Sequence, residues 1–180
     1  MFHVKQKAYD IIVVGAGHAG VEAATMASRL GCNTALVTFS SEDIGTLSCN
    51  PAMGGLGKGH LIREIDAMGG LIGRASDKSG IQFKVLNKTR GAAVQGPRAQ
   101  IDRNLYKKSM RSLIDVERVD ILFDEVESIC VSKHGVDSLS LKNKGKVLSK
   151  AIIVTTGTFL SGKIFRGNEA WPAERINRKP

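Results

Sequence analysis

The residues with the clearest chemical potential form a glycine-spaced hexapeptide, Gly15-Ala16-Gly17-His18-Ala19-Gly20. It lies between an apolar run, Tyr9–Val14, and a segment with small residues on one helical face, Gly20–Leu30. In this GxGxxG spacing, Gly15 permits a tight turn, Gly17 lets a pyrophosphate touch the backbone, and Gly20 allows close helix–strand packing. The free N–H groups and partial positive charge of the helix start then face the phosphates. The six residues therefore predict a dinucleotide site, with an ordinary glycine turn as the alternative.

The side chains near this motif are less informative than its glycines. We expect His18 to be a spacer whose backbone meets the cofactor and whose imidazole takes no part in catalysis. A carboxylate that binds the ribose is expected about 20 positions beyond the motif. The second apolar run ends at Thr38-Phe39-Ser40, and Glu42 and Asp43 follow slightly late. The sequence therefore leaves the ribose-binding residue unassigned.

A cysteine provides a second candidate chemical group. Cys49 precedes a glycine-rich stretch, Gly54–Gly59, that contains Lys58. A thiolate is a nucleophile, and backbone N–H groups and a nearby lysine favour it. Its alternative role is that of a buried small apolar side chain. Lys58 and Arg63 are candidates to contact an RNA phosphate or a flavin pyrophosphate, with plain surface charge as their alternative.

The number and spacing of the cysteines argue against disulfide bonds and against a metal site. The chain has three cysteines, an odd number at no metal-like spacing. Neither a disulfide framework nor a metal site is therefore expected, and the compartment is expected to be reducing.

The elements that position these residues fit one domain, because 180 residues match the usual domain size. The first three segments predict a β-α-β unit with parallel strands and a right-handed crossover: Tyr9–Val14, Gly20–Leu30 and Thr34–Phe39. A short amphipathic helix with Leu61, Ile65 and Met68 on one side follows. The remaining patterns predict a helix over Arg98–Leu113, a third parallel strand over Ile121–Phe123, an antiparallel meander over Val126–Leu148 and a buried strand over Ala151–Thr155.

The charge is unevenly distributed along the chain. The formal net charge is +9, and Lys58–Arg118 holds thirteen Lys and Arg against six Asp and Glu. A local basic surplus suits a polyanionic partner, because neutralised phosphates release counterions. A solvated basic face without a partner is the alternative. Apolar runs are only a few residues long and Met1–Lys7 carries no hydrophobic segment, so neither a membrane helix nor a targeting signal is expected.

The order of these elements distinguishes two kinds of dinucleotide fold. A meander followed by an apolar strand and a small-residue turn resembles the two-dinucleotide-binding flavoproteins. That resemblance implies an α/β, Rossmann-like FAD-binding domain with a parallel sheet and a small antiparallel β-meander. It also implies that Thr156 and Gly157, after the strand, lie beside FAD. Val126, entering the meander, corresponds to the position where this class contacts the adenine through its backbone.

Three further motifs are more specific than GxGxxG. They are the Cys-Asn-Pro and glycine stretch Ser48–Leu61, the segment Arg63–Gly70 and the segment Gly96–Arg103. With the GAGHAGxEAA start, they closely resemble the MnmG (GidA) family, the tRNA uridine 5-carboxymethylaminomethyl modification enzymes. The resemblance runs from about Tyr9 to Lys163.

The family resemblance implies a flavoenzyme that modifies C5 of the wobble uridine in tRNA. It implies FAD, NADH and methylene-tetrahydrofolate as cofactors, and tRNA and the GTPase MnmE as partners. It further implies a homodimer at full length and a location in the bacterial cytoplasm, which the lack of a targeting segment favours over the mitochondrial matrix. In this context a chemical role for Cys49 is favoured over a packing role.

Two departures from the family qualify these expectations. Family members are several times longer, so residues 1–164 would be only the N-terminal part of the FAD-binding domain. Residues 165–180 lack the family's glycine- and serine-containing loop, and we expect either a divergent tail or one that comes from a truncated or frameshifted reading frame. The alternatives are a catalytically silent FAD- or RNA-binding remnant, or another FAD-dependent oxidoreductase. The segment Cys49–Gly70 disfavours the last of these.

Overall fold

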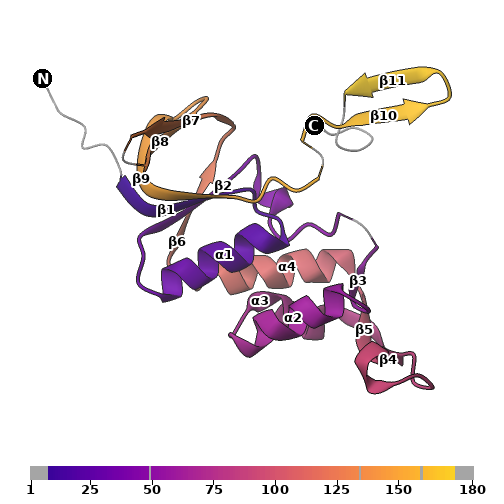
Figure 1. The fold of residues 1–180 in the computed structure, drawn as a ribbon. Helices are drawn as coiled ribbons and strands as arrows, with labels where there is room; N and C mark the ends of the chain where they lie inside the picture. The colour runs from indigo at the N-terminus through magenta and orange to yellow at the C-terminus, as the bar shows by residue number, and fades with distance from the viewer. Residues whose placement is uncertain (1–7, 49, 134, 159, 173–180) are drawn as a thin grey trace, which may run out of the picture.

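A six-stranded sheet forms the centre of the computed structural model, which describes residues 8–48, 50–133, 135–158 and 160–172 (Figure 1). The strand order is β6-β2-β1-β9-β8-β7. Its strands are β1 (Ala8–Val14), β2 (Thr34–Thr38), β6 (Val119–Phe123), β7 (Val126–Ser132), β8 (Gly135–Leu141) and β9 (Gly145–Val154). The strands β6, β2, β1 and β9 are parallel, whereas β8 and β7 continue the sheet antiparallel. The predicted parallel sheet with an antiparallel meander is thereby confirmed.

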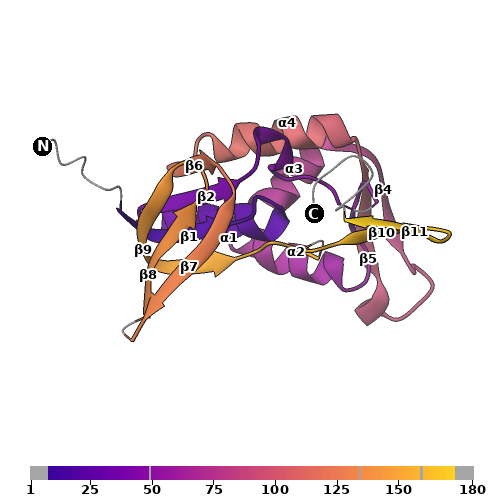
Figure 2. The same cartoon turned by 90° about the horizontal axis from the view of Figure 1, so that it is seen from above.

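The two faces of the parallel strands carry two different cores. Val13 and Leu36 point to one face, where they pack against the helices α1 (His18–Arg29) and α4 (Arg103–Ile114). Ile12 and Val37, one residue out of phase, point to the other face and pack under the meander. Side chains alternate between faces along a strand, so the continuous apolar runs of β1 and β2 follow from burial on both sides. Figure 1 shows the meander and the helices on opposite sides of β1 and β2, and Figure 2 looks down onto the meander.

The strand β9 belongs to both parts of the sheet. Its first residues pair antiparallel with β8, and Leu148–Val154 pairs parallel with β1. Two predictions for this segment are wrong: that the meander ends at Leu148 before a separate strand, and that the strand over Ala151–Thr155 is buried. The ten residues form one strand, and its end is open to solvent, with Val154 56% exposed. Figure 1 shows β9 as one continuous orange strand that leaves the meander and runs along β1.

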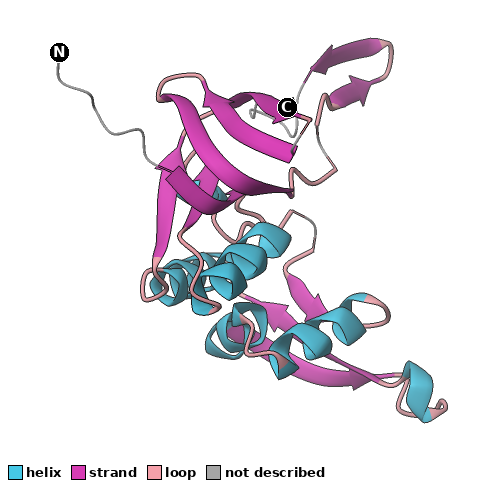
Figure 3. Cartoon of the chain, turned by 60° about the vertical axis from the view of Figure 1, so that its left-hand side comes forward, coloured by secondary structure: helices cyan, strands magenta, loops and turns pink. Residues whose placement is uncertain are grey.

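A second, smaller sheet lies on the far side of the helices (Figure 3). Its antiparallel strands are β3 (Ala52–Gly54), β5 (Gly96–Ile101) and β4 (Gly80–Leu86), in that order. The helices α2 (Lys58–Ala67) and α3 (Leu71–Ser79) pack beside it. The remaining elements are the 3-10 turns η1 (Ser41–Asp43) and η2 (Ala92–Val94) and a hairpin of β10 (Lys163–Arg166) and β11 (Glu169–Pro172).

Two helix predictions need correction. The helix expected from Arg98 begins only at Arg103, because Arg98–Ile101 is part of β5 and Asp102 is the N-cap, accepting from the Leu105 N–H at 2.8 Å. The expected apolar face of α2 is also wrong, since Leu61 and Met68 are 61% and 64% exposed. No described helix is long and apolar enough to cross a bilayer.

A buried carboxylate fixes the entry to the meander. Asp124, 6% exposed, accepts hydrogen bonds from the backbone N–H groups of Glu125, Asn143 and Lys144 at 2.8–3.2 Å. Burial opposes the charge of Asp124, but these donors outweigh it and hold the pKa of the carboxyl below its ordinary value. The ionised side chain thus ties the start of β7 to the turn between β8 and β9.

This pKa shift predicts a pH dependence of stability. A depressed pKa stabilises the fold above the unfolded-state value of about 3.9, and the contribution is lost as pH falls through the folded-state value. We expect Asp124→Asn to be less stable than the wild type at neutral pH, with the difference shrinking in acid. Urea unfolding at several pH values measures it, with exposed Asp77→Asn as the control for loss of one carboxylate. A difference that does not change with pH would contradict the expectation.

Candidate nucleotide-binding site

The turn between β1 and α1 is closed so tightly that two of its glycines admit no side chain. Gly15 has φ +98°, and a Cβ there would lie 2.5 Å from the Thr155 carbonyl oxygen. A Cβ on Gly20 would lie 1.7 Å from the Gly15 carbonyl oxygen. Such separations are impossible for real atoms, so both positions require glycine. This local geometry agrees with the turn and packing roles expected from the sequence.

Gly17 differs from its two neighbours in the motif. It is the N-cap of α1 with φ −67°, and a Cβ there would have no atom within 4 Å. The first intrahelical bond runs from the Val21 N–H to the Gly17 carbonyl at 3.0 Å, so the N–H groups of residues 18–20 have no acceptor within the helix. Open space in front of free donors at a helix start fits a phosphate group. The residues present therefore fit the pyrophosphate of a dinucleotide.

Thr155 completes this turn, and the sequence analysis did not assign it a role. Its hydroxyl donates to the carbonyl oxygens of Val14 and Gly15 at 2.8 and 2.9 Å, and its N–H donates to Val14 at 2.9 Å. Thr156 and Gly157, predicted to lie beside a cofactor, follow directly and are exposed, with Gly157 at φ +76°. The structure thus brings the end of β9 against the glycine motif. A threonine directly before the Thr-Gly turn was the available sequence signal.

Val126 lies at the carboxyl edge of the parallel strands, where β6 leads into the meander. The Asp124 N–H donates to the Thr38 carbonyl at 2.9 Å, which anchors this connection beside the end of β2. Val126 then pairs with Leu141 and packs, half-buried, against the core under the meander. In open α/β sheets, ligands bind beyond the carboxyl ends of the strands. Val126 and the glycine turn therefore share the edge at which a dinucleotide would bind.

The carboxylates that follow β2 are already engaged within the protein. Glu42 pairs with Lys107 at 2.7 Å and with Arg111 at 2.5 Å. Hydrogen bonds from these two cations lower the pKa of Glu42 to about 2. Asp43 accepts from the Ser40 N–H and hydroxyl, both at 3.0 Å. Both carboxylates therefore stabilise the turn after β2, and the ribose-binding residue remains unassigned.

His18 has an environment that its expected spacer role did not anticipate. Its ring packs against that of Tyr106, with centroids 5.7 Å apart. Burial, and secondarily the charge of Lys58, lowers the pKa of His18 to about 4, so the imidazole is neutral at physiological pH. Among the described residues, the buried Nε2 of His18 and the hydroxyl of Tyr106 have no hydrogen-bond partner. His18 belongs to the glycine turn itself, so its unpaired Nε2 is a hydrogen-bonding atom close to the place where a dinucleotide would bind.

The remaining candidates lie on the glycine-rich segment. Lys58 opens α2, and its ammonium group donates to the Ala52 carbonyl at 3.1 Å. Its charge acts on His18, so it lies on the side of the glycine turn. Arg63 is exposed on α2. Cys49 falls outside the described residues, between Ser48 and Asn50.

Comparison with known proteins gives a consistent result. The family model for glucose inhibited division protein A matches residues 10–180. The tRNA uridine 5-carboxymethylaminomethyl modification enzyme MnmG of Zymomonas mobilis is 46% identical over 178 residues, which cover 98% of this chain. The enzyme of the same name from Granulibacter bethesdensis is 47% identical over 182 residues, or 99% of the chain. The chain spans 29% of the length of each of these relatives.

Solved structures show the same likeness. Aquifex aeolicus GidA superposes with a TM-score of 0.91 at 42% identity, covering 96% of this chain and 29% of that one. A GidA-related protein from Thermus thermophilus superposes with a TM-score of 0.64 at 16% identity, covering 95% of this chain and 63% of that one. The second likeness concerns the fold alone. The family match includes residues 165–180, where the sequence analysis expected a divergent tail.

Proposed function

The chain belongs to the glucose inhibited division protein A family, and on that premise we propose that it is the FAD-binding part of a flavoenzyme that modifies C5 of wobble uridine in tRNA. The observation that carries the proposal is the glycine turn, where open space at Gly17 faces the start of α1 and Thr155 closes the other side. The basic surplus of Lys58–Arg118 supports a polyanionic substrate.

Different residues would hold different parts of FAD. Gly15–Gly20 would bind the pyrophosphate through backbone N–H groups, and Thr156 and Gly157 would lie beside the cofactor. The backbone of Val126 would contact the adenine. The neutral imidazole of His18, with its unpaired Nε2, adds a hydrogen-bonding group to this site. When bound, FAD would supply the electron transfer that the modification requires.

The glycine-rich segment would serve the RNA base. Uracil C5 is a poor nucleophile unless the ring is activated, and a cysteine thiolate is a group that can activate it. We assign this participation to Cys49, with Lys58 close in sequence to favour the thiolate. Lys58 and Arg63 would contact phosphate, of the cofactor or of tRNA.

The complete reaction would need more than this chain, because the relatives are over three times as long, the chain spanning 29% of them. For the full-length protein we propose NADH and methylene-tetrahydrofolate as further cofactors, MnmE as the partner GTPase, a homodimer, and a place in the bacterial cytoplasm. Residues 1–164 would be the N-terminal part of the FAD-binding domain, with residues 165–180 as a divergent tail.

Purification provides the direct test of cofactor binding. We expect the chain to carry stoichiometric FAD, visible in its absorbance spectrum, and Gly17→Val to lose it. The valine side chain would fill the space where the pyrophosphate meets the helix start. The fold should stay intact, because no protein atom lies within 4 Å of a Cβ added at Gly17. Circular dichroism should therefore match that of the wild type. A Gly17→Val protein with wild-type flavin content would overturn the proposal.

A further inference from the structure

Two like charges face each other across the small sheet. Lys84 on β4 and Arg98 on β5 are direct partners in the antiparallel register. Direct partners lie on the same face, with Cβ atoms about 5 Å apart, and like charges in this position destabilise a sheet. Among the described residues, no ion pair involves either side chain. The sheet thus presents a cation pair that the protein itself does not neutralise.

Amides flank the cation pair on the same face. Gln82 and Gln100 pair two residues away from Lys84 and Arg98, so they lie on the same face. Leu86 lies two residues beyond Lys84 in the other direction. These five side chains line a hollow of about 170 Å³. That volume is several times the roughly 30 Å³ of a water molecule in the liquid. Two cations and two amides thus offer hydrogen-bond donors around one concave surface, which suits an oxyanion.

The charge continues along the hairpin. Residues 80–101, from the start of β4 to the end of β5, contain four Lys and Arg and no Asp or Glu. Beyond Leu86, the loop carries Lys88 and Arg90, and amide side chains hold it: Asn87 donates to the Val94 carbonyl at 3.0 Å, and Gln95 donates to the Arg90 carbonyl at 2.9 Å. The hairpin therefore carries cations along its whole length, from the paired strands to the loop. Charge spread in this way fits an extended polyanion better than it fits a single ion.

We propose that this face of the β4–β5 hairpin binds the phosphate backbone of RNA, with Lys84 and Arg98 on either side of one phosphate. Lys88 and Arg90, in the loop of the hairpin, would contact phosphates further along the RNA strand. The proposal deepens the proposed function and rests on its tRNA substrate. It assigns a binding site to residues that lie outside the glycine turn and the cysteine segment. The bound phosphate would also remove the repulsion within the cation pair.

The test compares two double variants of equal charge. Lys84→Gln/Arg98→Gln removes the pair, and Lys144→Gln/Lys146→Gln removes two exposed cations near the β8–β9 turn, away from the small sheet. The probe is a tRNA transcript with uridine at the wobble position, titrated at several salt concentrations. Each phosphate contact contributes close to one unit to the slope of log K against log salt. Because the pair holds one phosphate, we expect the first variant to lose about one unit of slope and to bind roughly tenfold weaker near 0.1 M salt. The second variant should bind like the wild type.

The other outcomes separate the alternatives. Equal losses in both variants, or none in either, would overturn the proposal, as would a wild-type chain that binds no tRNA at low salt. Binding of inorganic phosphate but not of tRNA would mean a free-ion site, and binding of an acidic peptide in preference to tRNA would mean a protein surface; each overturns the RNA assignment. FAD absorbance is recorded for every sample. A chain without flavin whose tRNA binding still depends on Lys84 and Arg98 would contradict the FAD proposal and support this one.

Discussion

Gly20→Ala is expected to lower the free energy of unfolding by about 3 kcal/mol, since an added methyl group has no space in which to lie. The new Cβ would lie 1.7 Å from the Gly15 carbonyl oxygen and 2.7 Å from the Thr155 hydroxyl oxygen. The first of these is backbone, so no side-chain rotation relieves the clash. The helix α1 would have to move away from β1, and the phosphate-facing turn would open with it.

Gly17→Ala is the matched control, because it adds the same methyl group three residues before Gly20, where the methyl group meets only open space. Its cost is limited to the weaker N-cap preference of alanine, under about 1 kcal/mol. Urea unfolding followed by circular dichroism measures both variants. A Gly20→Ala protein as stable as Gly17→Ala would show that the turn can open without loss.

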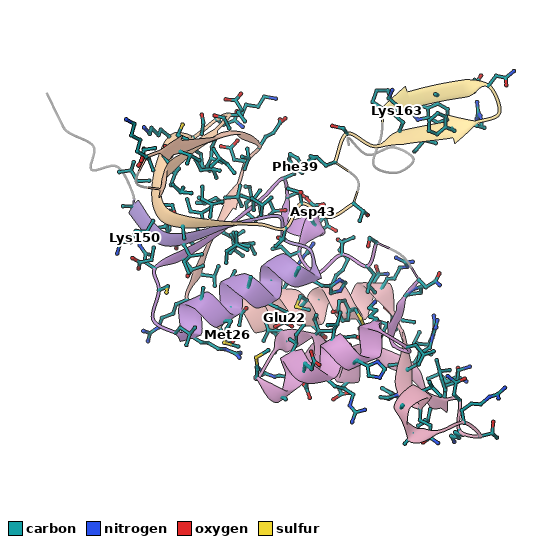
Figure 4. The ribbon with its side chains drawn as sticks, in the orientation of Figure 1. Glu22, Met26, Phe39, Asp43, Lys150 and Lys163 are labelled. Atoms are coloured by element: carbon teal, nitrogen blue, oxygen red, sulfur yellow. The ribbon has the colours of Figure 1, made fainter. Side chains whose placement is uncertain are left out.

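Glu22→Ala should produce the second large loss of stability. The Glu22 carboxylate on α1 lies on the side that faces α3 (Figure 4), where it accepts from the N–H groups of Leu71 and Ile72 at 2.8 and 2.7 Å. Both donors open α3 and belong to buried residues. Alanine would leave two buried N–H groups unpaired at a helix N-terminus, which costs about 3 kcal/mol.

Glu22→Gln separates the hydrogen bonds from the charge. The glutamine keeps one acceptor oxygen in the same place, so its cost should be about 1 kcal/mol, the part due to the helix dipole. Glu64→Ala, an exposed carboxylate on α2, controls for the loss of charge alone. Thermal unfolding should show Glu64→Ala as the most stable variant, Glu22→Gln as the next, and Glu22→Ala as the least stable. A Glu22→Ala protein as stable as Glu22→Gln would contradict the capping role.

The parts of the fold that sequence could predict are those fixed by local chemistry. The glycine spacing requires a turn that only glycine can form, and the apolar runs of β1 and β2 have no alternative to burial on both faces. Asp102 was equally readable, because an aspartate before a helical pattern is a typical N-cap. The helical periodicity, however, runs on through Asp102 to Arg98 and masks this boundary. The strand β5 could not be foreseen from that segment alone, since its pairing with β3 and β4 decides it.

The site was predictable to a similar extent. The hexapeptide identified the phosphate-facing turn, whereas the hydroxyl that closes it comes from Thr155, 140 residues away. No local pattern specifies a contact of that range. The exposure of Leu61 and Met68 shows the converse limit: helical spacing identifies an apolar face but does not say what covers it. Which side of α2 meets the protein depends on elements elsewhere in the chain.

The late position of β9 in the chain has a consequence for biosynthesis. One edge of β1 has no partner until Leu148–Val154 has been made, and the glycine turn is incomplete until Thr155 follows. At about 5–20 residues per second, the ribosome needs roughly 7 to 28 s to add the intervening 140 residues. An unpaired strand edge is a template for aggregation during that time. The nascent chain therefore passes through a stage that a nucleotide cofactor cannot stabilise, because the turn that would bind the cofactor is still incomplete.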